Sequence, residues 1–131
     1  MYIIDTDFII NYFKNKKRNV ELLTKALSEP DAKVFITSLT VYELIGGAHY
    51  SNNFEKNYSL YKELRNSVDV LELDEESAKI SGKIYAQLKK KGNNIGDTDI
   101  LIASICIKNQ CTLLTENINH FIKIEDIKIA K

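Results

Sequence analysis

The chain opens with Met1-Tyr2-Ile3-Ile4-Asp5-Thr6-Asp7-Phe8-Ile9-Ile10-Asn11-Tyr12-Phe13, and this stretch decides the fold. Residues 2–4 are apolar and β-branched or aromatic, which is typical of a strand in the middle of a parallel sheet. Two carboxylates flank a hydroxyl where the strand stops, and an apolar segment that can form a helix follows. Ligands of open α/β sheets bind beyond the carboxyl ends of the strands, so we expect Asp5 on the floor of a crevice.

Helix capping is the simpler interpretation of Asp5 when this residue is considered alone. Asp and Thr side chains both accept hydrogen bonds from the first turn of a helix, so Asp5 or Thr6 could cap the helix that follows. A catalytic role for Asp5 therefore depends on partner acids elsewhere in the chain.

The composition is that of an ordinary globular domain, with 44% hydrophobic and 27% charged residues among 131. We expect one domain over residues 1–131. The formal net charge is zero, so a nucleic-acid partner would have to be held by a local basic patch or by metal. Cys106 and Cys111 lack a metal-ligand spacing, and we expect neither a disulfide nor a metal role for them. We see no signal peptide and no apolar run of membrane-spanning length, and therefore expect a cytoplasmic protein without a membrane partner.

Predicted strands and helices alternate along the rest of the chain. Short apolar runs predict strands at 33–37, 68–73 and 112–115, with a further edge strand at 127–129. Helical periodicity or an unbroken apolar run predicts helices at 20–29, 39–45, 54–66, 75–91 and 99–107, with Ser38 or Thr40 able to cap the second of these. Segments 14–19 and 116–121 are expected as turn and loop. This alternation predicts a three-layer α/β/α sandwich around a central parallel sheet of about four to five strands.

Three acids lie near the ends of predicted strands or helices, at positions from which their side chains can reach the same crevice. Asp5 ends the first strand, Glu43 lies early in the helix after the second, and Asp99 opens the apolar helix before the fourth. Crowded carboxylates repel one another unless a cation is present, and oxygen ligands suit Mg²⁺ or Mn²⁺ better than zinc. We therefore predict that these three acids are the metal-binding and catalytic residues. The side chains expected to orient metal ligands or waters around them are Thr6, Asp7, Thr40, Asp97, Thr115 and Asn117.

Each acid also has an interpretation without chemistry. Asp99 could cap its helix, or Asp97 could cap it with Asp99 in the first turn. Glu43 could occupy a solvated helix position. His49 and His120 are isolated in the sequence and are interpreted as surface residues, and the basic segment 14–18 as a solvated turn that could contact phosphate.

Four segments, taken in order, resemble the PIN-domain nucleases, and within them the VapC-like toxins of type II toxin–antitoxin pairs. They are 3–7, 36–44 and 95–103, carrying the three acids, and 113–121, a closing strand and loop. The resemblance implies a PIN-like fold and a metal-dependent endoribonuclease, inhibited by a cognate antitoxin, that forms homodimers. Residues 39–64 are rich in Tyr and Leu, which favours an interface there.

The sequence departs from the family at one position. Many PIN domains carry a fourth acid where this chain has Asn117. Glu116 or Asp97 could substitute for it, or the position could simply be an amide here, which the resemblance to the toxins also allows. The departure bears on whether one or two ions bind.

Two other functions are compatible with parts of the pattern. Asp5-Thr6-Asp7 is similar to the strand end of haloacid-dehalogenase-type phosphatases, which also require a Thr where this chain has Ile9. The chain could also be a catalytically silent binding protein with a PIN-like fold, although Asp5, Glu43 and Asp99 would then have no purpose.

Overall fold

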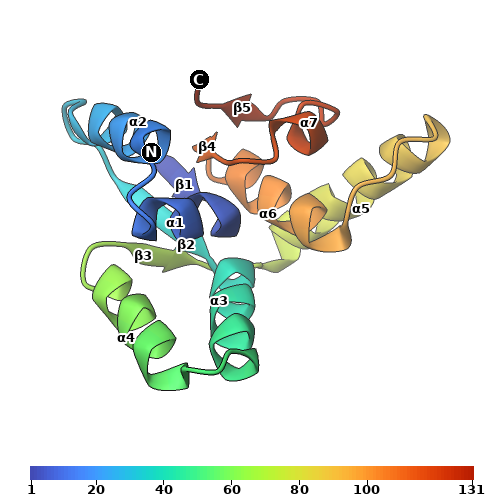
Figure 1. Cartoon of the computed structure of the whole chain (residues 1–131). Coiled ribbons are helices and arrows are strands. Elements are labelled where there is room, and N and C mark those ends of the chain that lie inside the picture. The colour runs from blue at the N-terminus through green and yellow to red at the C-terminus, as the bar shows by residue number, and fades with distance from the viewer.

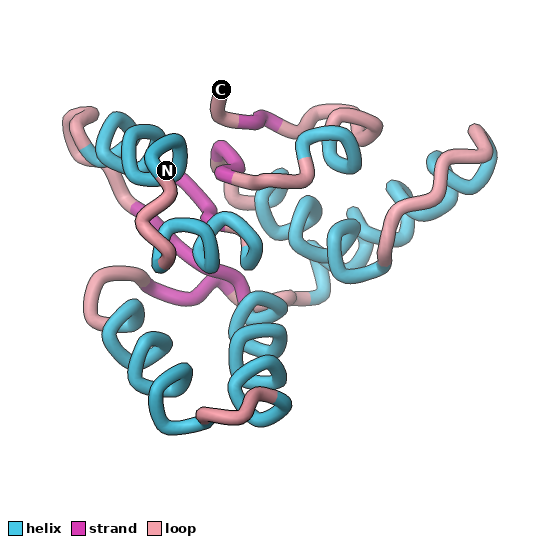
Figure 2. The backbone as a smooth tube through the Cα atoms, viewed as in Figure 1, coloured by secondary structure: helices cyan, strands magenta, loops and turns pink.

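The computed structural model describes residues 1–131 and contains one parallel sheet of five strands, in the order β3-β2-β1-β4-β5. The strands are β1 (Tyr2–Ile4), β2 (Val34–Thr37), β3 (Asp69–Leu71), β4 (Thr112–Leu114) and β5 (Lys128–Ile129). The apolar strand at the start of the chain is the central one, as its sequence predicts. Figure 2 shows the short strands crossing the molecule between the helices, with the last one at the outer edge beside the C-terminus.

Seven helices surround the sheet and form the two outer layers. Figure 1 shows α1 and α2 on one side of the sheet and α5, α6 and α7 on the other, while α3 and α4 form a pair that extends away from it. The predicted three-layer α/β/α sandwich is confirmed. The bounds are α1 (Thr6–Phe13), α2 (Lys17–Leu27), α3 (Ser38–Tyr50), α4 (Phe54–Arg65), α5 (Glu75–Lys90), α6 (Asp97–Lys108) and α7 (Ile118–Phe121).

The sheet separates two hydrophobic clusters because successive strand residues point to opposite faces. Ile3 pairs in register with Leu113, and both pack in the cluster beneath α5, α6 and α7. Ile4 pairs with Leu114, and both pack in the cluster beneath α1 and α2. A strand buried on both faces reads as an unbroken apolar run, which is why residues 2–4 do not alternate with polar ones.

Helix α6 packs against the sheet, α5 and α7, and is buried on nearly all sides. Its residues 102–106 are fully buried. Ser104 satisfies its hydroxyl by donating to the Ile100 carbonyl at 2.7 Å. An ion pair between Lys108 and Asp74, 2.8 Å apart, joins the end of α6 to the residue that precedes α5. The apolar sequence of α6 therefore follows from its place in the core.

Three local predictions are wrong. The N-cap of α3 is Thr37, whose hydroxyl accepts from the Thr40 amide at 3.2 Å, because the last strand residue already has the extended backbone that an N-cap requires. Helix α2 begins at Lys17, within the predicted turn, and α7 forms within the predicted loop. The predicted end of the helix over 75–91 is confirmed: α5 ends at Lys90, and Gly92 follows it with φ +70°, a conformation that glycine adopts easily.

Cys106 and Cys111 are free thiols in the core, where burial raises the pKa of both groups. None of the helices combines the length and the apolar character that crossing a membrane requires.

Candidate active site

The carboxyl ends of β1, β2 and β4 lie side by side because these strands are parallel neighbours. Asp5 follows β1 directly and is 3% exposed. Its Oδ1 accepts from the Thr6 amide at 2.8 Å, so it is the N-cap of α1. Its Oδ2 accepts from the hydroxyl of Thr115, which follows β4, at 2.7 Å. Asp5 therefore caps a helix and also lies at the edge of the sheet where a ligand would bind.

The electrostatic environment of Asp5 disfavours its charge. Burial is the largest cause of a pKa for Asp5 that is raised from 3.8 to about 6. Hydrogen bonds from Thr115 and Thr6 lower this pKa, and the negative charges of Asp99 and Glu43 raise it. None of the ion pairs in the structure involves Asp5 or Glu43. The negative charges of Glu43 and Asp99 therefore act on Asp5, and neither Asp5 nor Glu43 has a basic side chain beside it to neutralise its charge.

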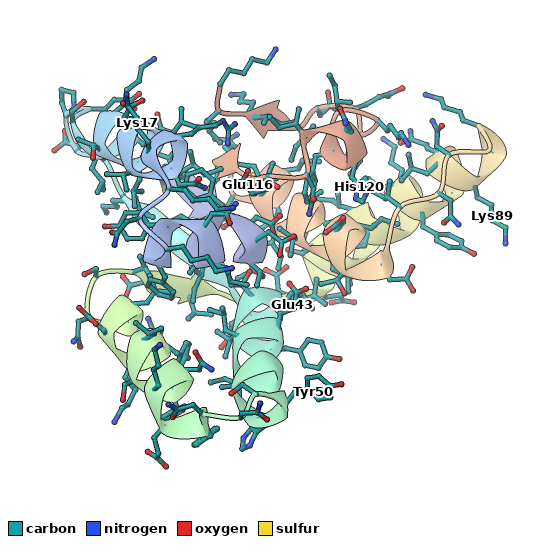
Figure 3. The ribbon with its side chains drawn as sticks, viewed as in Figure 1. Lys17, Glu43, Tyr50, Lys89, Glu116 and His120 are labelled. Atoms are coloured by element: carbon teal, nitrogen blue, oxygen red, sulfur yellow. The ribbon has the colours of Figure 1, made fainter.

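Glu43 is partly buried and turned toward α1. Its Oε1 accepts from the Thr6 hydroxyl at 2.7 Å, and the Thr6 and Thr40 hydroxyl oxygens are 3.1 Å apart. Figure 3 shows Glu43 at the end of α3 nearest to α1. Thr40 is fully buried. Two predicted neighbours of the acids, Thr6 and Thr40, therefore connect α1 to α3 at this place.

Asp99 lies in the first turn of α6, and neither it nor Asp97 caps that helix, because the N-cap is Gly96. The Asp99 Oδ2 is 2.9 Å from Nδ1 of His120 on α7. His120 is exposed, as expected of a surface residue, but its ring also contacts Asp99, which the sequence did not indicate. No sequence signal could have revealed this contact, since 21 residues separate the two and the path of α7 brings them together.

Asn117, where the resemblance predicts a fourth acid, lies between β4 and α7. Its side-chain Nδ2 donates to Asp7 Oδ2 at 3.2 Å, and its backbone amide donates to the Thr115 hydroxyl oxygen at 3.0 Å. Asn117 therefore connects Asp7 with Thr115, the residue whose hydroxyl donates to Asp5.

Neither of the two acids considered as a substitute joins Asp5. Glu116 bonds to α2 instead, accepting from Asn19 Nδ2 and pairing with Arg18 at 3.4 Å. Asp97 lines a separate hollow of about 370 Å³ with Tyr85 and Asn94, and makes no hydrogen bond with the side chains around Asp5. The prediction that Asp97 helps to orient ligands gains no support from its contacts.

No three of the Asp, Glu, His and Cys side chains lie close enough together to bond one ion directly. A magnesium ion retains several waters and is bound through one or two carboxylates, so such a triple contact is not a requirement. The oxygen donors, the buried acid and the absence of a basic partner for Asp5 and Glu43 fit a hydrated divalent cation.

A groove lies beside Glu43, between α1, α3 and α4. It has a volume of about 470 Å³ and is lined mainly by apolar side chains, together with two lysines. The lining includes Ile10, Leu44, Leu60, Tyr61, Lys14 and Lys56. Glu43 also lines it, so the groove reaches one of the three acids.

Comparison with known proteins gives a consistent family. Residues 2–127 match the PIN domain. Ribonuclease VapC1 of Haemophilus influenzae (strain R2866) is 32% identical over 129 residues, which cover 98% of this chain and 95% of the relative. The tRNA(fMet)-specific endonuclease VapC of Salmonella typhimurium is 29% identical over 128 residues, which cover 98% and 95%.

Solved structures of similar proteins share the fold over their full length. VapBC-1 from nontypeable Haemophilus influenzae aligns with a TM-score of 0.89 and 30% identity, covering 99% of this chain and 96% of the other. VapBC2 from Rickettsia felis, bound to a DNA fragment from their promoter, aligns with a TM-score of 0.89 and 25% identity, covering 98% and 96%. The four segments that carry the resemblance all lie within residues 2–127, which match the PIN domain.

Proposed function

The chain belongs to the PIN domain family, and from this premise we propose that it is a metal-dependent endoribonuclease acting as the toxin of a toxin–antitoxin pair. Relatives named as ribonucleases and as a tRNA endonuclease support the activity over nearly the full chain. The observation that carries the proposal is the setting of Asp5: a buried acid at the sheet edge, without a basic partner, within electrostatic reach of Glu43 and Asp99.

Asp5, Glu43 and Asp99 would hold Mg²⁺ or Mn²⁺, through direct contacts or through water. A divalent cation, when bound there, supplies positive charge for a phosphodiester oxygen and acidifies a water molecule for in-line attack on phosphorus. A protein with no net charge gains in this way the local positive charge that RNA binding requires.

The chain's own side chains prepare this site by holding each acid in place. Thr115 and the Thr6 amide fix the two oxygens of Asp5, and the Thr6 hydroxyl fixes one oxygen of Glu43. Thr6 therefore connects two of the three acids, and its rigid position at the start of α1 sets their relative placement. Such hydrogen bonds keep the free lone pairs of a carboxylate directed at its ligand.

The antitoxin is the second partner that we propose, because the similar structures are those of VapBC complexes. The groove between α1, α3 and α4 would receive an apolar segment of that protein. A cation on the same segment would reach Glu43 at the groove wall and neutralise the acid that the metal needs.

We further propose a homodimer in the cytoplasm. Tyr42 and Tyr50 on α3 are 70% and 94% exposed, and Figure 3 shows Tyr50 pointing away from the helix into solvent. Exposed tyrosines on one helix are typical of a surface that is covered in an oligomer.

The phosphatase alternative gains no support, since the position that would need a threonine holds Ile9, which is 1% exposed in the core. A silent binding protein would not require three acids, each with its own hydrogen-bond donor. The nuclease proposal therefore stands alone.

The test is expression with and without the neighbouring reading frame, beside cleavage of a mixed RNA by the purified protein. We expect growth arrest that the neighbour relieves, and cleavage that needs Mg²⁺ or Mn²⁺ and stops with EDTA. Cleavage that survives EDTA would overturn the metal dependence, and RNA left intact by a folded protein with either ion would overturn the nuclease.

A further inference from the structure

We propose that His120 is a positioning residue of this site, whose ring N–H fixes the orientation of the Asp99 carboxylate and thereby strengthens cation binding. The inference rests on the proposed function. It gives a positioning role to a side chain that the sequence pattern predicts to be an ordinary surface residue.

The first argument is the pattern of donors around the acids. Asp5 is held by Thr115 and Glu43 by Thr6, each through a hydroxyl group at 2.7 Å. Asp99 is held by Nδ1 of His120 at 2.9 Å. Every acid of the site thus has one side-chain donor, and each donor lies 21 or more residues away from its acid in the sequence.

The second argument is the chemistry of the pair. An ionised carboxylate only accepts hydrogen bonds, so Nδ1 of His120 carries a proton in this contact. One carboxylate oxygen of Asp99 is thereby occupied, and the other is left free for a cation or its waters. Hydrogen bonds of this kind, made to a ligating carboxylate, are worth about 10- to 100-fold in metal affinity or activity.

The third argument is that α7 is fixed at both of its ends. Phe121, the residue after His120, is fully buried in the core. Asn117, which precedes α7, is bound to Asp7 and Thr115. The imidazole is therefore held against α6, and Figure 3 shows it below α7 on the side that faces α6.

Stability of the fold does not account for the contact. The His120 and Asp99 side chains are 49% and 19% exposed, and ion pairs at such exposure contribute little to folding. A role in the site and a role in the fold therefore give different experimental results.

The experiment measures Mn²⁺ binding directly, from the electron paramagnetic resonance signal of the free ion, at one fixed pH and beside a thermal melt. His120→Leu removes the donor, and His120→Asn retains an N–H near the position of Nδ1. His120→Gln places its N–H one methylene further out. Asn119→Ala is the matched control, since Asn119 is an exposed neighbour on α7 without a contact to the acids.

We expect His120→Leu and His120→Gln to bind Mn²⁺ about tenfold more weakly. His120→Asn and Asn119→Ala should bind it like the unchanged protein, with similar melting temperatures. Mn²⁺ affinity that is kept in His120→Asn and lost in His120→Gln identifies the donor at Nδ1. This comparison tests the role of His120 even if the Leu variant does not fold.

Unchanged Mn²⁺ affinity in His120→Leu or His120→Gln would overturn the inference, as would an equal loss in His120→Asn. Those results would leave the proposed nuclease in place. Failure of the unchanged protein to bind Mn²⁺ would instead overturn the proposed metal site, and the role of His120 with it.

Discussion

Thr115 donates its hydroxyl hydrogen to Asp5 Oδ2 at 2.7 Å, although 110 residues separate the two in the sequence. The contact exists because β4 pairs with β1 in register, so that the residues following Leu114 and Ile4 emerge side by side. Thr115 also accepts from the Asn117 backbone amide, and thus connects Asn117 with Asp5.

Thr115→Val should raise the pKa of Asp5 further, because a hydrogen bond to the carboxylate lowers that pKa at present. The acidic limb of the cleavage rate against pH should move to higher pH. The buried oxygen left without a partner should cost about 1–3 kcal/mol of stability, measured by denaturant unfolding. Thr112→Val, at the other end of β4, is the control and should leave the pH profile unmoved.

Asp5→Asn should stabilise the metal-free protein at pH 7 while abolishing cleavage. A carboxyl whose pKa is higher in the folded protein, about 6, than in the unfolded chain, 3.8, contributes stability below pH 4 that is lost as the pH rises through 6. Asn carries no titrating proton, so the substitution removes this pH-dependent loss of stability, which amounts to about 3 kcal/mol at most.

Thermal melts of Asp5→Asn and the unchanged protein, in EDTA at pH 4 and pH 7, measure this effect. The gain in melting temperature should be larger at pH 7. A gain that is equal at both pH values would show that Asp5 is not held with a raised pKa.

Asp99→Asn should abolish RNA cleavage and leave the fold intact. Asn keeps the shape of Asp and accepts a hydrogen bond, but the site loses a negative charge toward the cation. We expect a loss of about a hundredfold or more in cleavage rate, with an unchanged thermal melt. Cleavage of a mixed RNA in Mg²⁺ or Mn²⁺ measures it, and a fully active, well-folded variant would remove Asp99 from the site.

Tyr50→Glu should convert the proposed dimer to a monomer, because it places a charge on the most exposed tyrosine of α3. Tyr85→Glu on α5, where the tyrosine is 48% exposed, is the matched control and should remain dimeric. Light scattering over a range of concentrations distinguishes the two variants. A purely monomeric unchanged protein at high concentration would contradict the dimer.

The sequence by itself determined the arrangement of layers and the edge of the sheet at which Asp5 lies. Residues 2–4 are apolar without alternation, which only a strand buried on both faces requires. Helix α6 is apolar on nearly all sides because it too is buried on nearly all sides. Parallel strands share one carboxyl edge, so an acid directly after a central strand could be placed in the crevice from its position in the chain alone. These features depend on periodicity and burial, which each segment carries within itself.

Only the tertiary structure decided which side chains hold the acids and which acids stay apart. His120 reaches Asp99, Thr6 reaches Glu43, and Glu116 turns to α2 rather than to Asp5. Such contacts depend on strand register and on the path of short elements such as α7, because a shift by one residue reverses the direction of a side chain. A local sequence pattern fixes the direction of a side chain within its own element, whereas the distance to a partner on another element is set by the packing of the whole chain.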